Sequence, residues 1–513
     1  MNTMARRGAV LMALALLFPL GLTACGGGGV VAGGGTGGTG VGPVTGFGSV
    51  IVNGVRYDDA KIDNTNFFDG HGRTKADLVV GMMVAVFGSI HGTDGTADNI
   101  TVLRHVDGPM DDNGVDLATN RLKVLGQDVL VDASTVFDNG IASLADLRTI
   151  QGANIKHPEL EVHGSADNNG VIRATFIHKW SDDRVAGREV QLRGTAAGLD
   201  TVAKAFSVGR QAVDYGGLGG VPAGLDNGAF VEVRGTLRAS DNVLAADSVK
   251  VEDATGGQPS GGRAEVEGYV NRVLTPNASF ELVGPNGVQT VTWTAGTTFF
   301  DGGTGADVRP GVKVEVEGTR KPDRSLAATK IAIRRASNVR MESTVTGVTS
   351  TTITIFGKTV TVNGLTQYED KSSIDLKTFG QADIAVNDNV RISAFLDNST
   401  NPATVVATRV ERIDPIAIDR HILQGPVDFI DPGGPSLTIL GVRGISGSPG
   451  ITVVTLPPPG TKFLRADETE FATQGDFFAA IAPGDIVKAR GNKASPGVVM
   501  NANEIQIEPA IDN

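Results

Sequence analysis

Few residues of this chain stand in a pattern that could perform catalytic chemistry. No two histidines form an H-x-H or H-E-x-x-H pair, so no zinc pattern is visible. The loop Gly444–Gly450 lacks the final glycine of a G-x-S-x-G nucleophile elbow. The acidic run Asp111–Asp116 resembles part of a calcium loop, but Pro109 stands at the first ligand position and no Glu closes it. We expect a solvated hairpin turn there, no metal, no cofactor and no enzyme activity.

One residue does have a clear chemical role. Cys25 is the only cysteine of the chain, and it ends the run Leu22, Thr23, Ala24, Cys25. This run matches the bacterial lipobox, in which the chain is cleaved before the cysteine and the thiol takes a diacylglycerol. Cys25 is therefore the expected lipidation site.

The segments around the lipobox agree with this interpretation. Arg6 and Arg7 precede an apolar run over residues 9–18, which is long enough for a secretory signal and too short to span a bilayer. We expect a signal peptide over residues 1–24. Residues 25–42 are then the lipidated cysteine and a Gly-rich tether, and several acyl chains on one cysteine give a firm anchor without a transmembrane helix.

Charge and anchor together predict the location. Lys and Arg number 45 against 57 Asp and Glu, so the formal net charge is -12, and a nucleic-acid partner that needs a basic surface is disfavoured. In the lipoprotein sorting rule Asp after the cysteine favours the inner membrane, whereas this chain has Gly26. We expect a cell-envelope protein anchored in the outer membrane, facing the periplasm or the cell surface. Its expected partners are the membrane and an envelope protein or polysaccharide.

The body repeats one unit about six times. Its most regular landmark is a short strand that ends in Gly, followed by a polar turn and a strand that contains Ala. Upstream lie a Gly-centred entry strand and a Thr-x-aromatic step, which the third unit lacks. The Gly-ending strands, two of them looser copies, are 83–88, 160–164, 230–235, 314–318, 390–394 and 487–491, and the Thr-x-aromatic steps are 65–67, 135–137, 298–300, 366–368 and 461–463.

Each unit has the pattern of β structure. Apolar and charged residues alternate over 312–317, which indicates a strand with one buried and one wet face. The segment 353–362 gives two β-branched runs around a Gly-containing turn, a hairpin signature. Segments 141–150 and 372–379 could form a small helix. About five short strands in some 70 residues favour a closed barrel, which removes exposed edges.

The predicted fold is all-β, with tandem OB-like five-stranded barrels; small β-sandwiches are the alternative. The predicted units are 43–105, 106–185, 186–253, 263–336, 341–414 and 420–513.

Single aromatic residues in the units admit two interpretations. They could form a binding face for a sugar or a peptide, as OB-like folds often bind extended ligands across one sheet. They could also fill small barrel cores, which is the interpretation we favour. The candidates are Trp180, Trp293, Tyr57, Tyr215, Tyr269 and Tyr368.

The lipobox, the tether, the segment Gly46–Asp58 and the recurrent Gly-strand-turn-Ala pattern resemble the bacterial lipoproteins built from the domain of unknown function DUF5666. The resemblance covers most of the chain after residue 43 and is clearest in the first two units. It implies an envelope location and a β-repeat architecture, and it brings no activity and no catalytic residues.

The predicted function is a non-enzymatic envelope lipoprotein that serves as a binding or structural scaffold. One alternative is an envelope ligand-binding protein with a specific site in a divergent unit, such as the sixth with its insertion 441–458. The other alternative, which we disfavour, is an envelope hydrolase.

Overall fold

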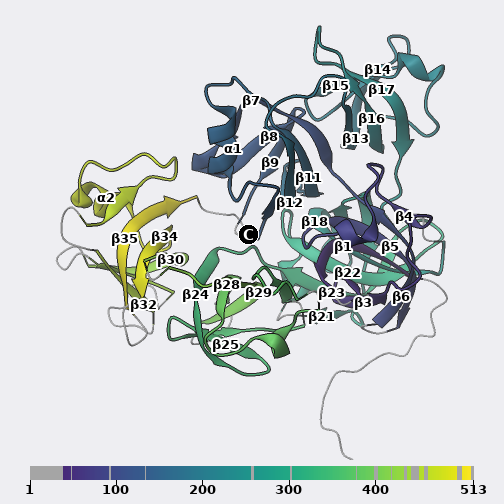
Figure 1. Cartoon of the computed structure of the whole chain (residues 1–513). Coiled ribbons are helices and arrows are strands. Elements are labelled where there is room, and N and C mark those ends of the chain that lie inside the picture. The colour runs from purple at the N-terminus through teal and green to yellow at the C-terminus, as the bar shows by residue number, and fades with distance from the viewer. Residues whose placement is uncertain are drawn as a thin grey trace, which may run out of the picture.

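The computed structural model describes most of the chain from Gly38 onward. The described ranges are 38–47, 49–91, 94–132, 134–255, 259–300, 303–364, 366–376, 378–397, 403–417, 419–431, 436–440, 450–455, 460–493 and 499–509. Regular structure in these ranges is almost entirely β-strand (Figure 1). None of the helices found there combines the length and the apolar character needed to cross a bilayer.

Six consecutive groups of five strands build the body, and we number them barrels 1 to 6. Barrel 1 comprises β1 (Gly38–Gly46), β2 (Val50–Val52), β3 (Val55–Asp58), β5 (Met83–His91) and β6 (Asp94–Val102). Barrel 2 comprises β7 (Val106–Asp116), β8 (Arg121–Val124), β9 (Gln127–Leu130), β11 (Glu159–Ala166) and β12 (Ile172–Ser181). Barrel 3 comprises β13 (Glu189–Asp200), β14 (Ala205–Val208), β15 (Gln211–Asp214), β16 (Phe230–Leu237) and β17 (Leu244–Val251).

The second half of the chain repeats this arrangement. Barrel 4 comprises β18 (Arg263–Thr275), β19 (Ser279–Gly284), β20 (Gly287–Thr292), β22 (Lys313–Arg320) and β23 (Leu326–Arg334). Barrel 5 comprises β24 (Val339–Val348), β25 (Thr352–Ile355), β26 (Lys358–Thr361), β28 (Asn389–Asp397) and β29 (Thr404–Ile413). Barrel 6 comprises β30 (His421–Asp431), β31 (Ser436–Ile439), β32 (Ile451–Thr455), β34 (Ile486–Lys493) and β35 (Val499–Glu508).

All six groups close in the same order. The first strand pairs with the second and the fourth, the second with the third, and the fourth with the fifth. The third strand runs parallel to the fifth and completes the ring. In barrel 4 this closure is the parallel pair β20–β23, with Val291 opposite Leu326. The same pairings occur in the other five barrels. The prediction of tandem OB-like five-stranded barrels is therefore confirmed, and the sandwich alternative is wrong.

The Gly and Ala landmarks meet at one β-bulge in each barrel. The register between the fourth and fifth strands shifts at Gly88, Gly164, Gly235, Gly318, Ala394 and Gly491, and each of these residues lies opposite an Ala of the fifth strand. A Cβ at Gly235 would lie 2.0 Å from the carbonyl oxygen of Ala245. The repeated Gly leaves space for a backbone that crosses at the bulge, where a bulged strand can bend into a ring.

The Thr-x-aromatic step forms a short extra strand that runs parallel to the fifth strand. In barrels 2, 5 and 6 its threonine hydroxyl donates a hydrogen bond to the Ala carbonyl at the bulge, as in Thr135 to Ala174 at 2.8 Å and Thr461 to Ala502 at 2.6 Å. In barrel 1 the Thr65 hydroxyl donates to Asp63 instead. In barrel 4 the donor is Thr297, one residue before the expected Thr298. The extra strands are β4 (Phe67–Phe68), β10 (Val136–Asp138), β21 (Thr298–Phe300), β27 (Gln367–Asp370) and β33 (Lys462–Leu464), and barrel 3, described without a gap from β13 to β17, has none.

Between the third and fourth strands each barrel carries a short helix. Barrel 2 has α1 (Leu144–Gln151), capped by the Ser143 side chain, and barrel 6 has α2 (Gln474–Ala480), capped by Thr473. Single 3-10 turns take this place elsewhere, at η1 (Lys75–Asp77), η3 (Gly216–Leu218), η4 (Gly305–Asp307) and η5 (Gln381–Asp383); a further turn, η2 (Leu117–Thr119), lies between β7 and β8. The described residues of the segment 372–379, which leave out residue 377, do not form the expected helix, and the helical turn of barrel 5 begins only at Gln381.

The first strands join the barrels in three pairs. β1 of barrel 1 lies parallel to β18 of barrel 4, β7 pairs with β13 of barrel 3, and β24 pairs with β30 of barrel 6. Barrels 1 and 4 are thus neighbours although two barrels separate them in sequence. β1 begins at Gly38, so the first barrel includes residues 38–42, which we expected in the tether.

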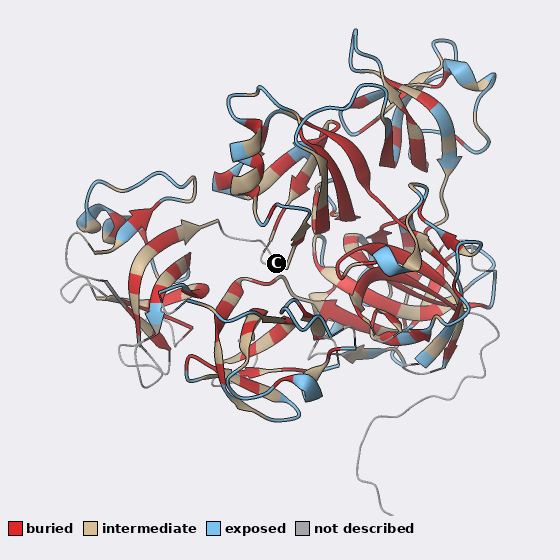
Figure 2. Ribbon diagram, viewed as in Figure 1, coloured by how far each residue is buried: buried red, intermediate tan, exposed pale blue. Residues whose placement is uncertain are grey.

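The hydrophobic cores continue across these pairs. Met341 of barrel 5 and Leu423 of barrel 6 lie opposite each other and are both fully buried. Burial of one such side chain contributes about 1.5–3 kcal/mol. Figure 2 shows buried residues along the strands and exposed ones along the connecting loops. The expectation of a wet face over 312–317 is wrong at Glu315, which is only 1% exposed and pairs with Lys330 and Arg334 of the neighbouring strand.

Candidate functional site

The predicted lipidation site lies outside the described residues. Cys25 and the lipobox residues Leu22, Thr23 and Ala24 precede Gly38, the first described residue. Their roles remain sequence-based predictions. Within the described ranges, no three His, Cys, Asp or Glu side chains are placed to hold a metal ion together.

The aromatic candidates divide into core and junction residues. Tyr57, Tyr215 and Trp293 are buried in barrel cores, as expected. Trp180 instead lies between two guanidinium groups, with the Arg73 and Arg188 Cζ atoms 4.7 and 5.5 Å from its ring centre. The remaining two, Tyr269 and Tyr368, line a cavity between barrels.

The acidic segment of barrel 2 is not a hairpin turn. Residues Asp111–Asp116 belong to β7, which carries a bulge between Met110 and Val115. The Asp116 side chain accepts from the backbone of Ala118 and caps η2. The Asp111 carboxylate accepts from the backbone of Gly126, so the two aspartates bind separate backbone groups.

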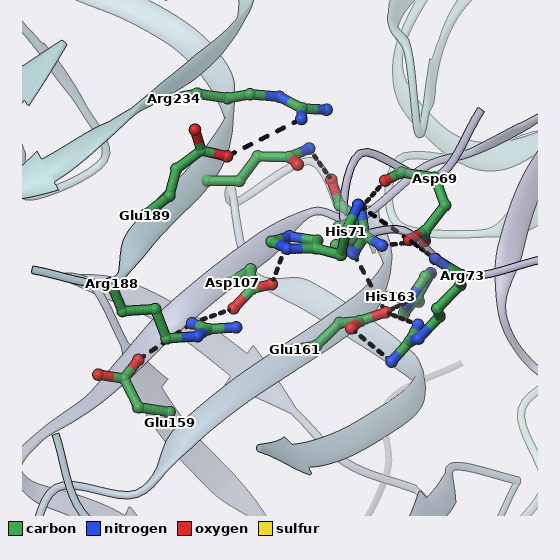
Figure 3. Close-up of polar contacts among 12 residues, drawn as sticks. Asp69, His71, Arg73, Asp107, Glu159, Glu161, His163, Arg188, Glu189 and Arg234 are labelled. Carbon is green, nitrogen blue, oxygen red and sulfur yellow. Dashed lines mark hydrogen bonds and ion pairs between the residues drawn. The ribbon is translucent and has the colours of Figure 1, made fainter. Parts of the chain in front are cut away.

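A buried ionic cluster joins barrels 1 and 2 (Figure 3). At its centre is Arg104, which lies on the link between β6 and β7 and is wholly buried. Its guanidinium donates to the backbone carbonyl and the carboxylate of Asp69, and its Nε lies 3.3 Å from Glu161 Oε1. Arg73 forms a two-point pair with the same Glu161 at 2.8 and 2.9 Å. The loop after β4 is therefore fixed to β11 by charge-assisted hydrogen bonds.

His163 completes this cluster in a defined protonation state. Met83 of barrel 1 donates its backbone N–H to His163 Nδ1 at 3.0 Å, so Nδ1 is the acceptor. Nε2 carries the proton and donates to Glu161 at 2.6 Å. Burial lowers the pKa of His163, in agreement with a neutral ring. Burial acts to raise the pKa of Glu161, but the hydrogen bond from His163 and the charges of Arg104 and Arg73 outweigh it and hold that pKa well below its ordinary range.

A second part of the cluster extends toward barrel 3. Asp107 of β7 lies 3.1 Å from His71 Nε2 and 2.7 Å from Arg188 Nη1, and the same Arg188 nitrogen lies 3.2 Å from Glu159 (Figure 3). Arg188 immediately precedes Glu189, the first residue of β13. The carboxylates of Asp107 and Glu159 are fully or almost fully buried. The cluster therefore also fixes the entry into barrel 3.

Barrel 3 is in turn held to barrel 4. Arg193 of β13 forms an ion pair with Glu232, and its Nη1 donates to Asn286 Oδ1, in the turn between β19 and β20, at 2.7 Å. Asn286 is 3% exposed. Barrels 1 to 4 thus form one continuous body.

The sequence did not reveal the residues of the buried ionic cluster, because their partners come from other strands and loops and meet only in the folded chain. Glu161 and His163 share one face of β11, as the strand period predicts. From sequence alone, a strand face with such polar residues is expected to be exposed to solvent. The available signal was Arg104, a charged residue in a link of only three residues between two strands. Three of the seven histidines, His105, His163 and His421, are buried.

One cavity lies between barrels rather than within one. It has a volume of about 500 Å³ and is lined by residues of barrels 1, 2, 4 and 5, such as Arg56, Arg173, Tyr269 and Arg409. Arg409 Nη1 reaches the carbonyl of Ser134 in barrel 2 at 3.5 Å. Barrel 6, with the insertion 441–458, contributes no lining residue in its described part, and residues 441–449 and 456–459 lie outside the description.

Comparison with known proteins identifies the repeated unit. Residues 107–178, 267–332 and 342–411 match the family model of a domain of unknown function, DUF5666. Three barrel-sized segments of the chain thus match DUF5666. These segments coincide with barrels 2, 4 and 5, so the resemblance seen in the sequence is confirmed there. Barrel 1, which we expected to be among the clearest copies, lies outside the matched ranges.

The other comparisons add little to the DUF5666 assignment. No curated protein matches this chain. A solved chain entitled drosophila Unr CSD456 aligns with 48% of this chain and 98% of its own length, at 14% identity and a TM-score of 0.18. A similarity this low carries no argument about structure or function.

Proposed function

We propose that this protein is a non-catalytic lipoprotein of the cell envelope whose barrels form a rigid scaffold. The observation that carries the scaffold is the way in which the barrels are joined. Strand pairing unites them in three pairs, and the buried cluster around Arg104 fixes barrels 1 to 3. A surface displayed on such a body keeps its geometry, whereas barrels on flexible linkers would not.

Membrane attachment through Cys25 is the second part of this proposal. It is supported by the lipobox Leu22–Cys25 and by the apolar leader before it. Gly26 after the cysteine supports the outer membrane. A body held beside the membrane can present its barrels to an envelope protein or polysaccharide.

Two measurements test the anchor. The wild-type chain should be labelled by radioactive palmitate and partition with detergent-solubilised membranes, and Cys25→Ser should lose both properties. Gly26→Asp is the matched control, because it keeps the acylated thiol and should move the protein from the outer to the inner membrane. Palmitate label on Cys25→Ser would contradict the anchor.

Small-angle scattering tests the scaffold. The mature chain with Cys25→Ser should scatter as the single body seen in Figure 1. An elongated, variable particle would contradict a rigid scaffold and would instead indicate independent barrels.

A second candidate function, ligand binding at one specific site, is favoured by the cavity between barrels 1, 2, 4 and 5. Repeats alone do not create such a cavity, because it exists only where four different barrels meet. A single asymmetric pocket with convergent polar groups is the usual form of a binding site.

A hydrolase screen of the mature chain with Cys25→Ser tests the non-catalytic part of the first proposal. We expect no turnover of any substrate in the screen.

A further inference from the structure

The cavity between barrels 1, 2, 4 and 5 differs in charge from the rest of the protein. Its lining contains seven basic and three acidic side chains, whereas the whole chain carries a net charge of -12. All four barrels contribute basic residues: Arg56, Arg173, Arg309, Lys313, Arg334, Arg335 and Arg409. Such a concentration of one sign in a concave site raises the local concentration of oppositely charged ligands.

Part of this positive charge is already neutralised by the protein. Lys313 Nζ lies 2.7 Å from Glu267, and Arg173 Nε lies 3.0 Å from Asp167. Arg409 forms ion pairs with Glu369 and Glu411. Arg334 pairs with Glu315 and Glu267, and Arg335 Nη1 lies 3.5 Å from Asp397. These groups are held in position by the fold and contribute donors to the lining rather than free charge.

Two arginines are left for a ligand. Arg56 on β3 and Arg309 after η4 line the cavity, and both are exposed. In the part of the chain that the structure describes, neither forms an ion pair with a carboxylate. The pKa of nearby Asp307 is lowered mainly by hydrogen bonds from Thr304, with a smaller contribution from the charge of Arg309. They come from barrels 1 and 4, so two different barrels contribute these arginines to one lining.

Aromatic rings complete the lining. The Arg173 Cζ atom lies 5.9 Å from the ring centre of Tyr269, and Arg335 Cζ lies 5.5 Å from that of Phe395. The Thr175 hydroxyl is buried and has no hydrogen-bond partner among the described residues. Arginine forks suit the planar geometry of carboxylate and phosphate, and an aromatic face suits the flat side of a sugar ring.

We propose that this cavity binds an anionic sugar-sized ligand through its phosphate or carboxylate group. Arg56 and Arg309 make the charge-assisted hydrogen bonds, and Tyr269 packs against the body of the ligand. The volume of about 500 Å³ falls in the range of small-molecule sites. This inference deepens the second candidate function above and is independent of the membrane anchor.

Titration calorimetry on the mature chain with Cys25→Ser tests the proposal. The probes are glucose 6-phosphate, glucuronate and glucose, which separate phosphate, carboxylate and neutral sugar. We expect one of the two anions to bind with a dissociation constant of about 1 mM or lower, more weakly as salt is added, and glucose not to bind.

Substitutions assign the binding to the cavity. Arg56→Gln and Arg309→Gln should each weaken binding of the anion about tenfold, because each removes one charge-assisted contact. Arg272→Gln is the matched control, since this exposed arginine pairs with Glu281 away from the lining and should leave binding unchanged. Unchanged thermal unfolding of all three variants shows that the fold is intact.

Three outcomes would overturn the proposal: no binding of either anion, equal binding of glucose, or an equal loss of affinity in Arg272→Gln. Scattering and palmitate labelling are separate readouts. A failure of binding is therefore distinguishable from a failure of the scaffold or of the anchor.

Discussion

The Nε atom of Arg104 lies 3.3 Å from Oε1 of Glu161, and neither side chain reaches solvent. The two residues belong to the link between barrels 1 and 2 and to a strand of barrel 2. A buried charge is tolerated only where a partner and further hydrogen bonds compensate for the lost water. Here the compensation comes from Asp69, Arg73 and His163.

Removal of this arginine should destabilise the body. Arg104→Met leaves Glu161 and Asp69 without their common partner and should lower the free energy of unfolding by about 3–5 kcal/mol. Urea denaturation followed by tryptophan fluorescence measures the change. The double variant with Glu161→Gln should be less destabilised than the sum of the two single variants. Additive losses would mean that the pair is not coupled.

The bulge glycine should not tolerate a side chain. In Gly235→Val the Cβ would lie 2.0 Å from the Ala245 carbonyl oxygen, so two strands of barrel 3 must separate. We expect a loss of at least about 2 kcal/mol in the free energy of unfolding. Gly220→Ala, where an added Cβ meets no atom within 4 Å, is the control and should be near neutral. Similar thermal unfolding of both variants would contradict the proposed role of the bulge.

Glu265 should make stability fall as the pH rises. Burial and the neighbouring carboxylates of Glu315 and Glu317 raise its pKa well above its usual range. A group whose pKa is raised on folding stabilises the protein below the pKa of the unfolded chain, and that contribution is lost as the pH climbs through the folded pKa. Glu265→Gln imitates the protonated form, so it should match the wild type at low pH and be more stable at neutral pH.

Urea midpoints of Glu265→Gln and the wild type, measured across this pH range, test the sign. Glu281→Gln is the control. Arg272 holds the pKa of Glu281 below its usual value, so this substitution should reduce stability more at neutral pH than at low pH. An equal loss of stability in Glu265→Gln at every pH would show that folding does not raise the pKa of Glu265.

Glu232 should make the free energy of unfolding depend on pH in the acid range. Burial opposes ionisation of this residue, but the charges of Arg193 and Arg234 prevail and lower its pKa from 4.5 to about 2. A lowered pKa stabilises the protein above the unfolded value, and the contribution disappears as the pH falls from 4.5 toward 2. The wild type should lose about 3 kcal/mol over this interval through Glu232. Glu232→Gln should show a correspondingly shallower pH dependence of the free energy of unfolding, and an unchanged slope would rule out this role.

Much of the barrel could be derived from the sequence, because its determinants are local. A strand period places Val314 and Val316 on one face. The repeated Gly at positions such as Gly235 and the Ala in the following strand have a steric cause within a single unit, where two neighbouring strands cross. The Thr-x-aromatic step is likewise local, and its absence from the third unit corresponds to the missing short strand there. The lipobox around Cys25 is a linear signal and needs no fold at all.

The arrangement of the barrels could not be derived in this way. Strand pairing between Val41 and Val266 joins segments more than two hundred residues apart. Neither segment carries a sequence pattern that identifies the other as its partner. Arg104 and Asp69 are only 35 residues apart, yet neither local sequence predicts their contact. Nor does the sequence around Arg56 predict that it shares a cavity with Arg309. Burial of a charge is a property of everything packed around it, so only the tertiary structure decides whether a polar strand face meets water, a neighbouring barrel or a ligand site.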